Sequence, residues 1–175
     1  MAAISRSRRA ASGIALIVAG AAQLLFVLLP FVGVTLSWLL PVAYLAIAVG
    51  LVILALGGVN NTIAKVALFA GALGWLVLAL VQLSIGLPGG VATVGVFLAA
   101  IGTLVGAIVL YAGREIIQIS GLVFVITAAL GFLLLLPGLG ITALSGLALF
   151  WAVAFGIGLV LTGLYFRRTE RKRSR

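Results

Sequence analysis

The chain has 175 residues, of which 65% are hydrophobic and only 7% are charged, and its mean hydropathy is +1.46. A soluble domain is about half apolar and about one-quarter charged, so this composition excludes a water-soluble fold of this size. The sequence contains no Cys and no His, which excludes disulfide bonds and metal or haem sites built on those residues. We therefore expect no cofactor and no resident metal.

Apolar segments of about twenty residues follow one another along the chain, each long enough to cross ~30 Å of hydrocarbon. In lipid, backbone polar groups must be paired within the protein, which leaves helices or a closed barrel. A barrel would show short segments of alternating polarity. Because these segments are unbroken, the sequence predicts an all-α membrane protein. Its six transmembrane helices are expected at about 10–29, 34–56, 66–85, 91–112, 116–136 and 142–166.

Basic residues fall on one side of this arrangement. They precede the first helix, lie in the second and fourth connections, and crowd the end of the chain: Arg6, Arg8, Arg9, Lys65, Arg114, Arg167, Arg168, Arg171, Lys172, Arg173 and Arg175. The turns near Pro30, Pro88 and Pro137, on the other side, carry no charge. Because cytoplasmic loops collect Lys and Arg, we expect both termini in the cytoplasm and the protein in a bacterial inner (plasma) membrane.

The same pattern divides the chain into a basic cytoplasmic N-terminus at 1–9, a transmembrane domain at 10–166 and a basic cytoplasmic tail at 167–175. The first helix has the basic start and apolar stretch of a signal peptide. However, no convincing small-x-small cleavage site follows Pro30. We therefore expect this helix to remain in the protein.

Three helical hairpins, at about 10–57, 66–112 and 116–166, share a pattern. In each, a small residue and a Gly open the rising helix, a Pro ends it, and a Gly recurs in the returning helix. These residues are Ser12, Gly13, Pro30 and Gly50; Ala70, Gly71, Pro88 and Gly106; and Ser120, Gly121, Pro137 and Gly156. Because each hairpin crosses the membrane twice, tandem copies would be parallel repeats around a pseudo-threefold axis. The plainer explanation is that Gly and Pro punctuate any helical hairpin.

The third hairpin carries a family resemblance. Its rising stretch SGLVFVITAALGFLLLLP, from Ser120 to Pro137, and its returning stretch GIGLVLTGLYFRR, from Gly156 to Arg168, resemble the HdeD-like family of small six-helix bacterial membrane proteins. In architecture the resemblance covers nearly the whole chain. It implies three tandem hairpins and, because the family name is linked to acid resistance, a stress-related role without a defined chemistry.

Small residues recur at four-residue spacing on three of the predicted helices. Lipid removes the hydrophobic drive between helices, so close backbone contact must hold them together. We expect these stripes to pack helix on helix within the chain, or to contact a partner membrane protein or a second copy. The residues are Ala11, Ala15, Ala19, Gly102, Gly106, Ala148, Ala152 and Gly156.

Few polar side chains lie within the predicted spans. Gln23 and Gln82 lie at similar depths, and we expect them either to share an interhelical hydrogen bond of roughly 1 kcal/mol or to line a small outer-facing polar pocket. Ser84 and Thr93 are the other candidates for that pocket. Glu115 is expected in a hydrated loop at the cytoplasmic edge. No charged residue lies clearly at the bilayer centre, which argues against a proton or ion relay.

The basic tail is expected to contact anionic lipid at the cytoplasmic face, at about 1 kcal/mol per basic residue near the surface. Its contact residues would be Arg167, Arg168, Arg171, Lys172, Arg173 and Arg175. The same charges would also attract nucleic acid. Because every basic residue lies on one predicted face of a membrane, we expect a lipid contact and no nucleic-acid partner.

Two functions fit the sequence. The first is a non-enzymatic structural or accessory membrane protein, stress-related, that acts through helix packing with partners or lipid. The alternative is a membrane-embedded binding or transport subunit for a small, mostly apolar solute. Six helices with an Ala-rich first helix also resemble the substrate-binding subunits of energy-coupling vitamin transporters. Because acid–base groups and phosphate-binding loops are lacking, we do not expect an enzyme.

Overall fold

The computed structural model describes residues 6–57, 59–83, 88–139 and 147–168. Over these ranges the chain forms helices and no strand, which confirms the predicted all-α fold. The α-helices are α1 (Arg6–Leu28), α2 (Leu39–Ala55), α3 (Thr62–Gln82), α4 (Gly89–Phe97), α5 (Thr103–Ala112), α6 (Gln118–Leu135) and α7 (Ala148–Arg168). Three short elements complete them: the 3-10 turns η1 (Leu29–Val32) and η3 (Leu136–Leu139), and the π-helical turn η2 (Leu98–Gly102).

Five of the described helical stretches are long and apolar enough to cross a membrane, as expected of a multi-pass membrane protein. The sixth, α2, has 17 residues and is equally apolar. At 1.5 Å per residue it is about 25 Å long, the lower limit for a spanning helix. The five longer stretches are Ser7–Val32, Thr62–Gln82, Gly90–Ala112, Gln118–Leu135 and Ala148–Arg167.

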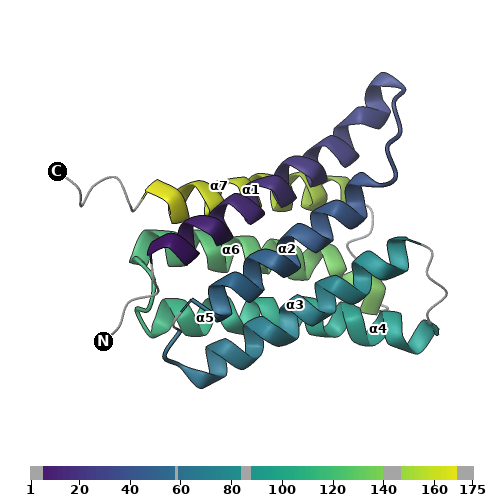
Figure 1. The fold of residues 1–175 in the computed structure, drawn as a ribbon. Coiled ribbons are helices and arrows are strands. Elements are labelled where there is room, and N and C mark those ends of the chain that lie inside the picture. Colours follow the sequence, from purple (N-terminus) through teal and green to yellow (C-terminus); the bar gives the residue numbers. More distant parts are fainter. Residues whose placement is uncertain (1–5, 58, 84–87, 140–146, 169–175) are drawn as a thin grey trace.

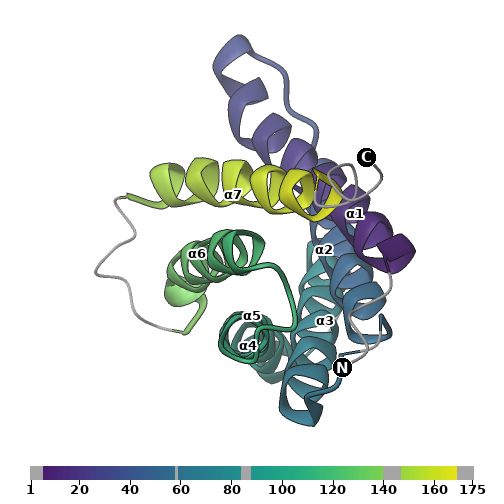
Figure 2. The ribbon, with the colours of Figure 1, turned by 90° about the vertical axis from the view of Figure 1, so that its left-hand side faces the viewer.

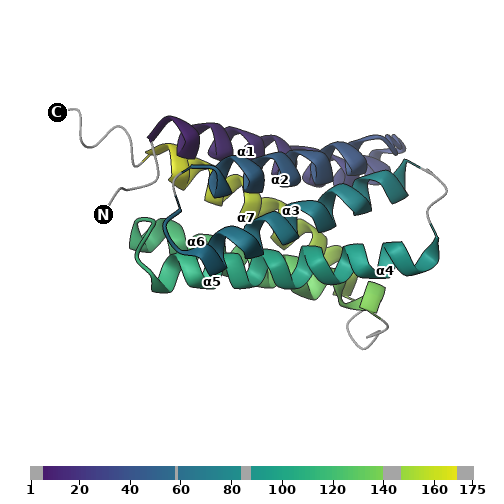
Figure 3. The same ribbon diagram turned by 60° about the horizontal axis from the view of Figure 1, so that its bottom comes forward.

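The helices form a closed ring in chain order. Each packs on the next, and α7 closes the ring by packing on α1. Figure 2 shows this order around the bundle, and in Figure 3 α4, η2 and α5 form one continuous rod. The start of α1, the end of α7 and the α2–α3 and α5–α6 connections share one end (Figure 1). We call this the basic end, because it holds every described Arg and Lys: Arg6, Arg8, Arg9, Lys65, Arg114, Arg167 and Arg168.

The second helix starts later than predicted. It was expected from about Val34, but the chain forms η1, reverses at Gly33 with a left-handed φ of 78°, and begins α2 only at Leu39. Pro41 is the cause. Its ring clashes with the carbonyl four residues earlier and it has no N–H to donate, so a helix tolerates it only in the first turn.

The helices reach further into the charged termini than predicted. The N-terminal arginines were expected before the first helix, but α1 begins at Arg6. Likewise, α7 continues to Arg168 instead of ending at Phe166. Long basic side chains can keep their charge in water while their stems lie along an apolar helix. The expected start of the sixth helix at residue 142 lies outside the described residues.

The fourth predicted helix is interrupted. Residues 91–112 were expected as one α-helix, but η2 inserts a π-helical turn at Leu98–Gly102. A π-turn contains one more residue than an α-helical turn, so the side chains that follow it point in a different direction around the helix axis. Here it sits directly against α3, where Ala99 and Gly102 are buried.

Glycines bring two pairs of helices into backbone contact. Where α1 crosses α7, a Cβ added at Gly20 would lie only 2.6 Å from the carbonyl oxygen of Gly156. Where α3 crosses η2 and α5, a Cβ at Gly71 would lie 2.8 Å from the backbone nitrogen of Thr103. No larger residue fits at such distances, so these glycines allow the close approach that holds helices together in lipid. We call these two crossings the glycine seams.

The centre of the ring is filled by aromatic side chains. Trp75 on α3 is 1% exposed, stacks on Phe155 of α7 at 5.7 Å between ring centroids, and contacts Tyr44 of α2 at 5.1 Å. Its indole N–H donates to the Thr103 hydroxyl of α5 at 3.0 Å. On α6, Gly131 leaves the space that the Phe155 ring occupies. Residues of α2, α3, α5, α6 and α7 therefore meet around one Trp.

Candidate functional site

Several buried hydroxyl groups join helices within the bundle. The hydroxyls of Thr127 on α6 and Thr162 on α7 lie 2.9 Å apart, and Thr127 also donates to the carbonyl of Val123 in its own helix. Ser12 of α1 donates to the carbonyl of Gly50 in α2 at 2.8 Å. Buried polar groups need such partners. These bonds therefore account for their residues as structural links.

Three buried side chains of the described residues carry a polar atom without a hydrogen-bond partner: Gln23 (Oε1), Ser120 (Oγ) and Trp151 (Nε1). Gln23 is 3% exposed on α1 and lies against Gly156 of α7, the helix that also carries Trp151. The Gln23 oxygen is an acceptor, the Trp151 nitrogen is a donor, and the Ser120 hydroxyl can be either. An unsatisfied buried polar group costs about 1–3 kcal/mol, so these three side chains are the interior candidates to meet a polar group from outside the chain.

The predicted polar pocket does not assemble. Gln23 is buried between α1 and α7, whereas Gln82 is exposed at the end of α3 and Thr93 is exposed on α4. The expected Gln23–Gln82 hydrogen bond is wrong, because α2 lies between α1 and α3 in the ring and Oε1 of Gln23 has no partner. Ser84 lies outside the described residues.

The predicted small-residue stripes are divided between inside and outside. Ala19 and Ala152 are buried, and Gly102, Gly106 and Gly156 contact neighbouring helices of the same chain. In contrast, Ala11 and Ala148 are exposed. Ala15 is half-buried and faces Gly50 of α2. The predicted stripes did not include six further glycines that contact neighbouring helices: Gly13, Gly20, Gly71, Gly74, Gly95 and Gly163. Of these, the sequence pattern had pointed only to Gly13 and Gly71, as openers of hairpins.

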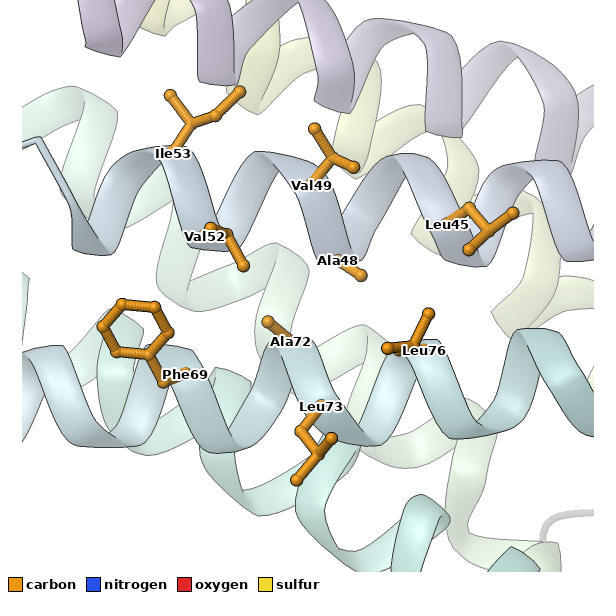
Figure 4. A pocket seen from close by; sticks show the side chains of 9 residues that line it. All are labelled: Leu45, Ala48, Val49, Val52, Ile53, Phe69, Ala72, Leu73 and Leu76. Atoms are coloured by element: carbon orange, nitrogen blue, oxygen red, sulfur yellow. The ribbon is translucent and has the colours of Figure 1, made fainter.

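A groove lies between α2 and α3 on the outer side of the ring (Figure 4). It has a volume of about 390 Å³. Two alanines, Ala48 and Ala72, face each other across it, and large apolar side chains such as Leu73, 53% exposed, form its rim. The lining residues are Leu45, Ala48, Val49, Val52, Ile53, Phe69, Ala72, Leu73 and Leu76. We call this the α2–α3 groove.

A second groove of about 320 Å³ lies between α6 and α7. Ala154 and Gly158 line it at four-residue spacing, and Ile126 and Ile157 on its rim are about half exposed. Its one polar lining residue, Thr127, already bonds to Thr162. Like the first, this α6–α7 groove opens toward the surroundings of the bundle and not toward its centre.

At the basic end, the carboxylate of Glu115 joins two connections between helices. The Glu115 carboxylate accepts the backbone N–H groups of Asn60 and Asn61 at 3.0 and 2.8 Å, so it joins the α5–α6 connection to the start of α3. The Asn61 side chain caps α3 by accepting from Ile63 and Ala64. A carboxylate is favoured at a helix N-terminus by the helix dipole. Glu115 is thus a structural tie between two connections as well as part of a loop.

The predicted lipid-contacting residues are only partly described. Arg167 is exposed in the last turn of α7, and Arg168 ends that helix. Arg171, Lys172, Arg173 and Arg175 lie outside the described residues. At the same end, the Arg8 guanidinium donates to the carbonyl of Leu56, just after α2.

Comparison with protein-family models, with curated proteins and with solved structures finds no match. The resemblance to the HdeD-like family therefore remains a prediction from the sequence.

Proposed function

We propose that this protein is a non-enzymatic structural or accessory component of a bacterial inner membrane, related to stress, which acts through contacts of its outer surface with partner helices or lipid. In this proposal all six helical rods cross the bilayer and both termini are cytoplasmic. The three hairpins would be tandem parallel repeats, as the resemblance to the HdeD-like family implies.

The observation that carries this proposal is where the bundle is packed and where it is hollowed. The centre is filled by Trp75 and its neighbours, whereas both described grooves open outward among exposed Leu, Val and Ile side chains. A protein that handled a solute internally would be expected to enclose a pocket with a few convergent polar groups. Outward recesses instead suit contact with molecules that share the membrane.

The distribution of charge supports the proposed topology. Every described Arg and Lys lies at the basic end, including Lys65 after α2 and Arg114 after α5. The opposite end, with Pro30 and Pro137, has no charge among its described residues. This segregation fits a cytoplasmic basic end and requires α2, although short, to cross the bilayer.

A binding or transport subunit for a small, mostly apolar solute is the alternative, and one observation favours it. Gln23 buries an acceptor that no described residue satisfies. A solute with one polar group could supply that donor. Native mass spectrometry of the purified protein tests this: a bound small mass that disappears in Gln23→Leu would support the alternative, and an empty chain would exclude it.

The main proposal is tested by photo-crosslinking in native membranes. A benzoyl-phenylalanine at position 157 would place the probe on the rim of the α6–α7 groove, and one at position 18 on α1 is the matched control. Ile157 and Val18 are both 47% exposed, and of the two only Ile157 lines either of the grooves described above. We expect a discrete protein adduct from position 157 that Ala154→Trp abolishes by filling the groove. Equal adducts from both positions, or none from 157, would contradict the proposal.

A further inference from the structure

The α2–α3 groove continues toward a positive charge. Along α3 its lining residues Phe69, Ala72, Leu73 and Leu76 fall on one face, at the spacing of successive helical turns. One turn before Phe69 on that same face is Lys65, which is exposed. The apolar α2–α3 groove therefore leads toward the Lys65 ammonium group at the basic end.

The distance along α3 from Lys65 to the far end of the groove matches the thickness of one leaflet of the bilayer. From Lys65 to Leu76 there are eleven residues, which at 1.5 Å per residue is about 16 Å. Half of a ~30 Å hydrocarbon core is about 15 Å. A chain that starts at Lys65 and follows the groove would thus reach to about the middle of the bilayer.

A second cation lies at the same end of the groove, on its α2 side. On the facing helix, Leu56 is one turn beyond Val52 and Ile53 of the groove, and its carbonyl holds the Arg8 guanidinium. An Arg has five N–H donors, so Arg8 can bond to Leu56 and still attract an anion. The one acid among the described residues, Glu115, is engaged by the backbone of Asn60 and Asn61.

We propose that the α2–α3 groove binds an anionic phospholipid of the leaflet at the basic end, with one acyl chain in the groove and the phosphate at Lys65. The inference rests on the proposed function only in that the chain spans a bilayer. A purely apolar partner helix would bring no anion to the exposed Lys65. A phospholipid brings both an acyl chain for the groove floor of Ala48 and Ala72 and a negative phosphate for the Lys65 ammonium group.

The test uses the full chain, titrated with palmitoyl-oleoyl phosphatidylglycerol in detergent and followed by native mass spectrometry. Lys65→Gln removes the charge without touching the bundle, and we expect about fivefold weaker binding of the first lipid, from ~1 kcal/mol per basic residue at the surface. Lys65→Arg should retain binding. Ala48→Trp should abolish the same site by filling the groove.

Matched controls separate this site from general attraction. Arg114→Gln removes a charge at the same end, between α5 and α6, and Ala21→Trp adds bulk at an exposed alanine of α1. Both variants should bind the first lipid as the unchanged protein does. Equal binding by Lys65→Gln, or equal binding of phosphatidylcholine, would overturn the proposal. Because only pure lipid is added, this result does not depend on the partner adduct at position 157, and each proposal can fail alone.

Discussion

The glycine seams and the α2–α3 interface solve the same packing problem differently. At the α1–α7 seam, Gly20 meets the backbone of Gly156, and no side chain separates the helices. Between α2 and α3, alanines face each other and larger residues stand at the rim, which leaves a groove of about 390 Å³. Both interfaces are apolar, so hydrophobicity does not distinguish them.

The orientation of the glycines explains the difference. Gly50 of α2 faces Leu16 of α1, and Gly71 and Gly74 of α3 face η2 and its neighbours. Neither helix turns a glycine toward the other. In lipid, association depends on close packing more than on hydrophobic drive, so an interface without glycine retains space that a membrane component can fill.

The largest expected effect contrasts the two faces of α3. Trp75→Ala removes the side chain at the centre of the ring and should cost about 3–5 kcal/mol, whereas Leu73→Ala on the groove rim should cost well under half of that. Unfolding by sodium dodecyl sulfate in mixed micelles, followed by circular dichroism, measures both. Similar losses for the two variants would mean that the ring centre is not the core.

A seam substitution should come next. Gly20→Ala places a methyl group against the backbone of Gly156 and should cost about 1–3 kcal/mol by overpacking. Gly90 of α4 is the control, because an added Cβ there meets nothing within 4 Å. Gly90→Ala should therefore be neutral or slightly stabilising, since alanine restricts the unfolded chain. The same unfolding assay would refute the seam if both substitutions were neutral.

A smaller effect is expected from the hydroxyl pair across α6 and α7. Thr127→Val and Thr162→Val each break their bond of 2.9 Å. Interhelical hydrogen bonds in membrane proteins average about 0.6 kcal/mol and reach ~1.7 kcal/mol, so a double-mutant cycle should give a coupling energy in that range. Additive effects of the two substitutions would show that the hydroxyls do not interact.

The smallest effect is expected in the groove itself. Ala48 is only 6% exposed, but it lies at the floor of the groove, so Ala48→Leu adds bulk where space exists. The free energy of unfolding should therefore change by about 0.5 kcal/mol or less. Ala19→Leu, at a fully buried position of α1, is the comparison and should be destabilising. If Ala48→Leu were as costly as Ala19→Leu, the groove would be a packed interface.

The sequence predicted the helices well because hydropathy and length decide which segments suit a bilayer. Pro41 is also a sequence signal for the late start of α2, because proline is tolerated only in the first turn of a helix. The π-turn at Leu98–Gly102 could not be foreseen, since no residue type marks it and tertiary contact with α3 accompanies it. Helix ends in particular depend on such contacts.

The candidate sites were harder to predict than the fold. Equal depth along the chain suggested that Gln23 and Gln82 meet, but depth says nothing about which helices are neighbours in a ring. The positions of the grooves depend on which neighbouring helix each glycine faces. That can be known only once the rotation of every helix about its own axis is known. In a chain with 23 glycines, four-residue spacing alone could not separate Gly20, at a seam, from Ala11, which faces outward.

The six-span topology depends most on whether the short helix α2 crosses the membrane. Because the chain has no Cys, Thr35→Cys and Asn60→Cys introduce unique thiols at exposed positions on either side of α2. A membrane-impermeant maleimide added to intact cells should label position 35 and leave position 60 unlabelled until the membrane is opened. Labelling of both positions in intact cells would place them on one side and contradict the six-span account.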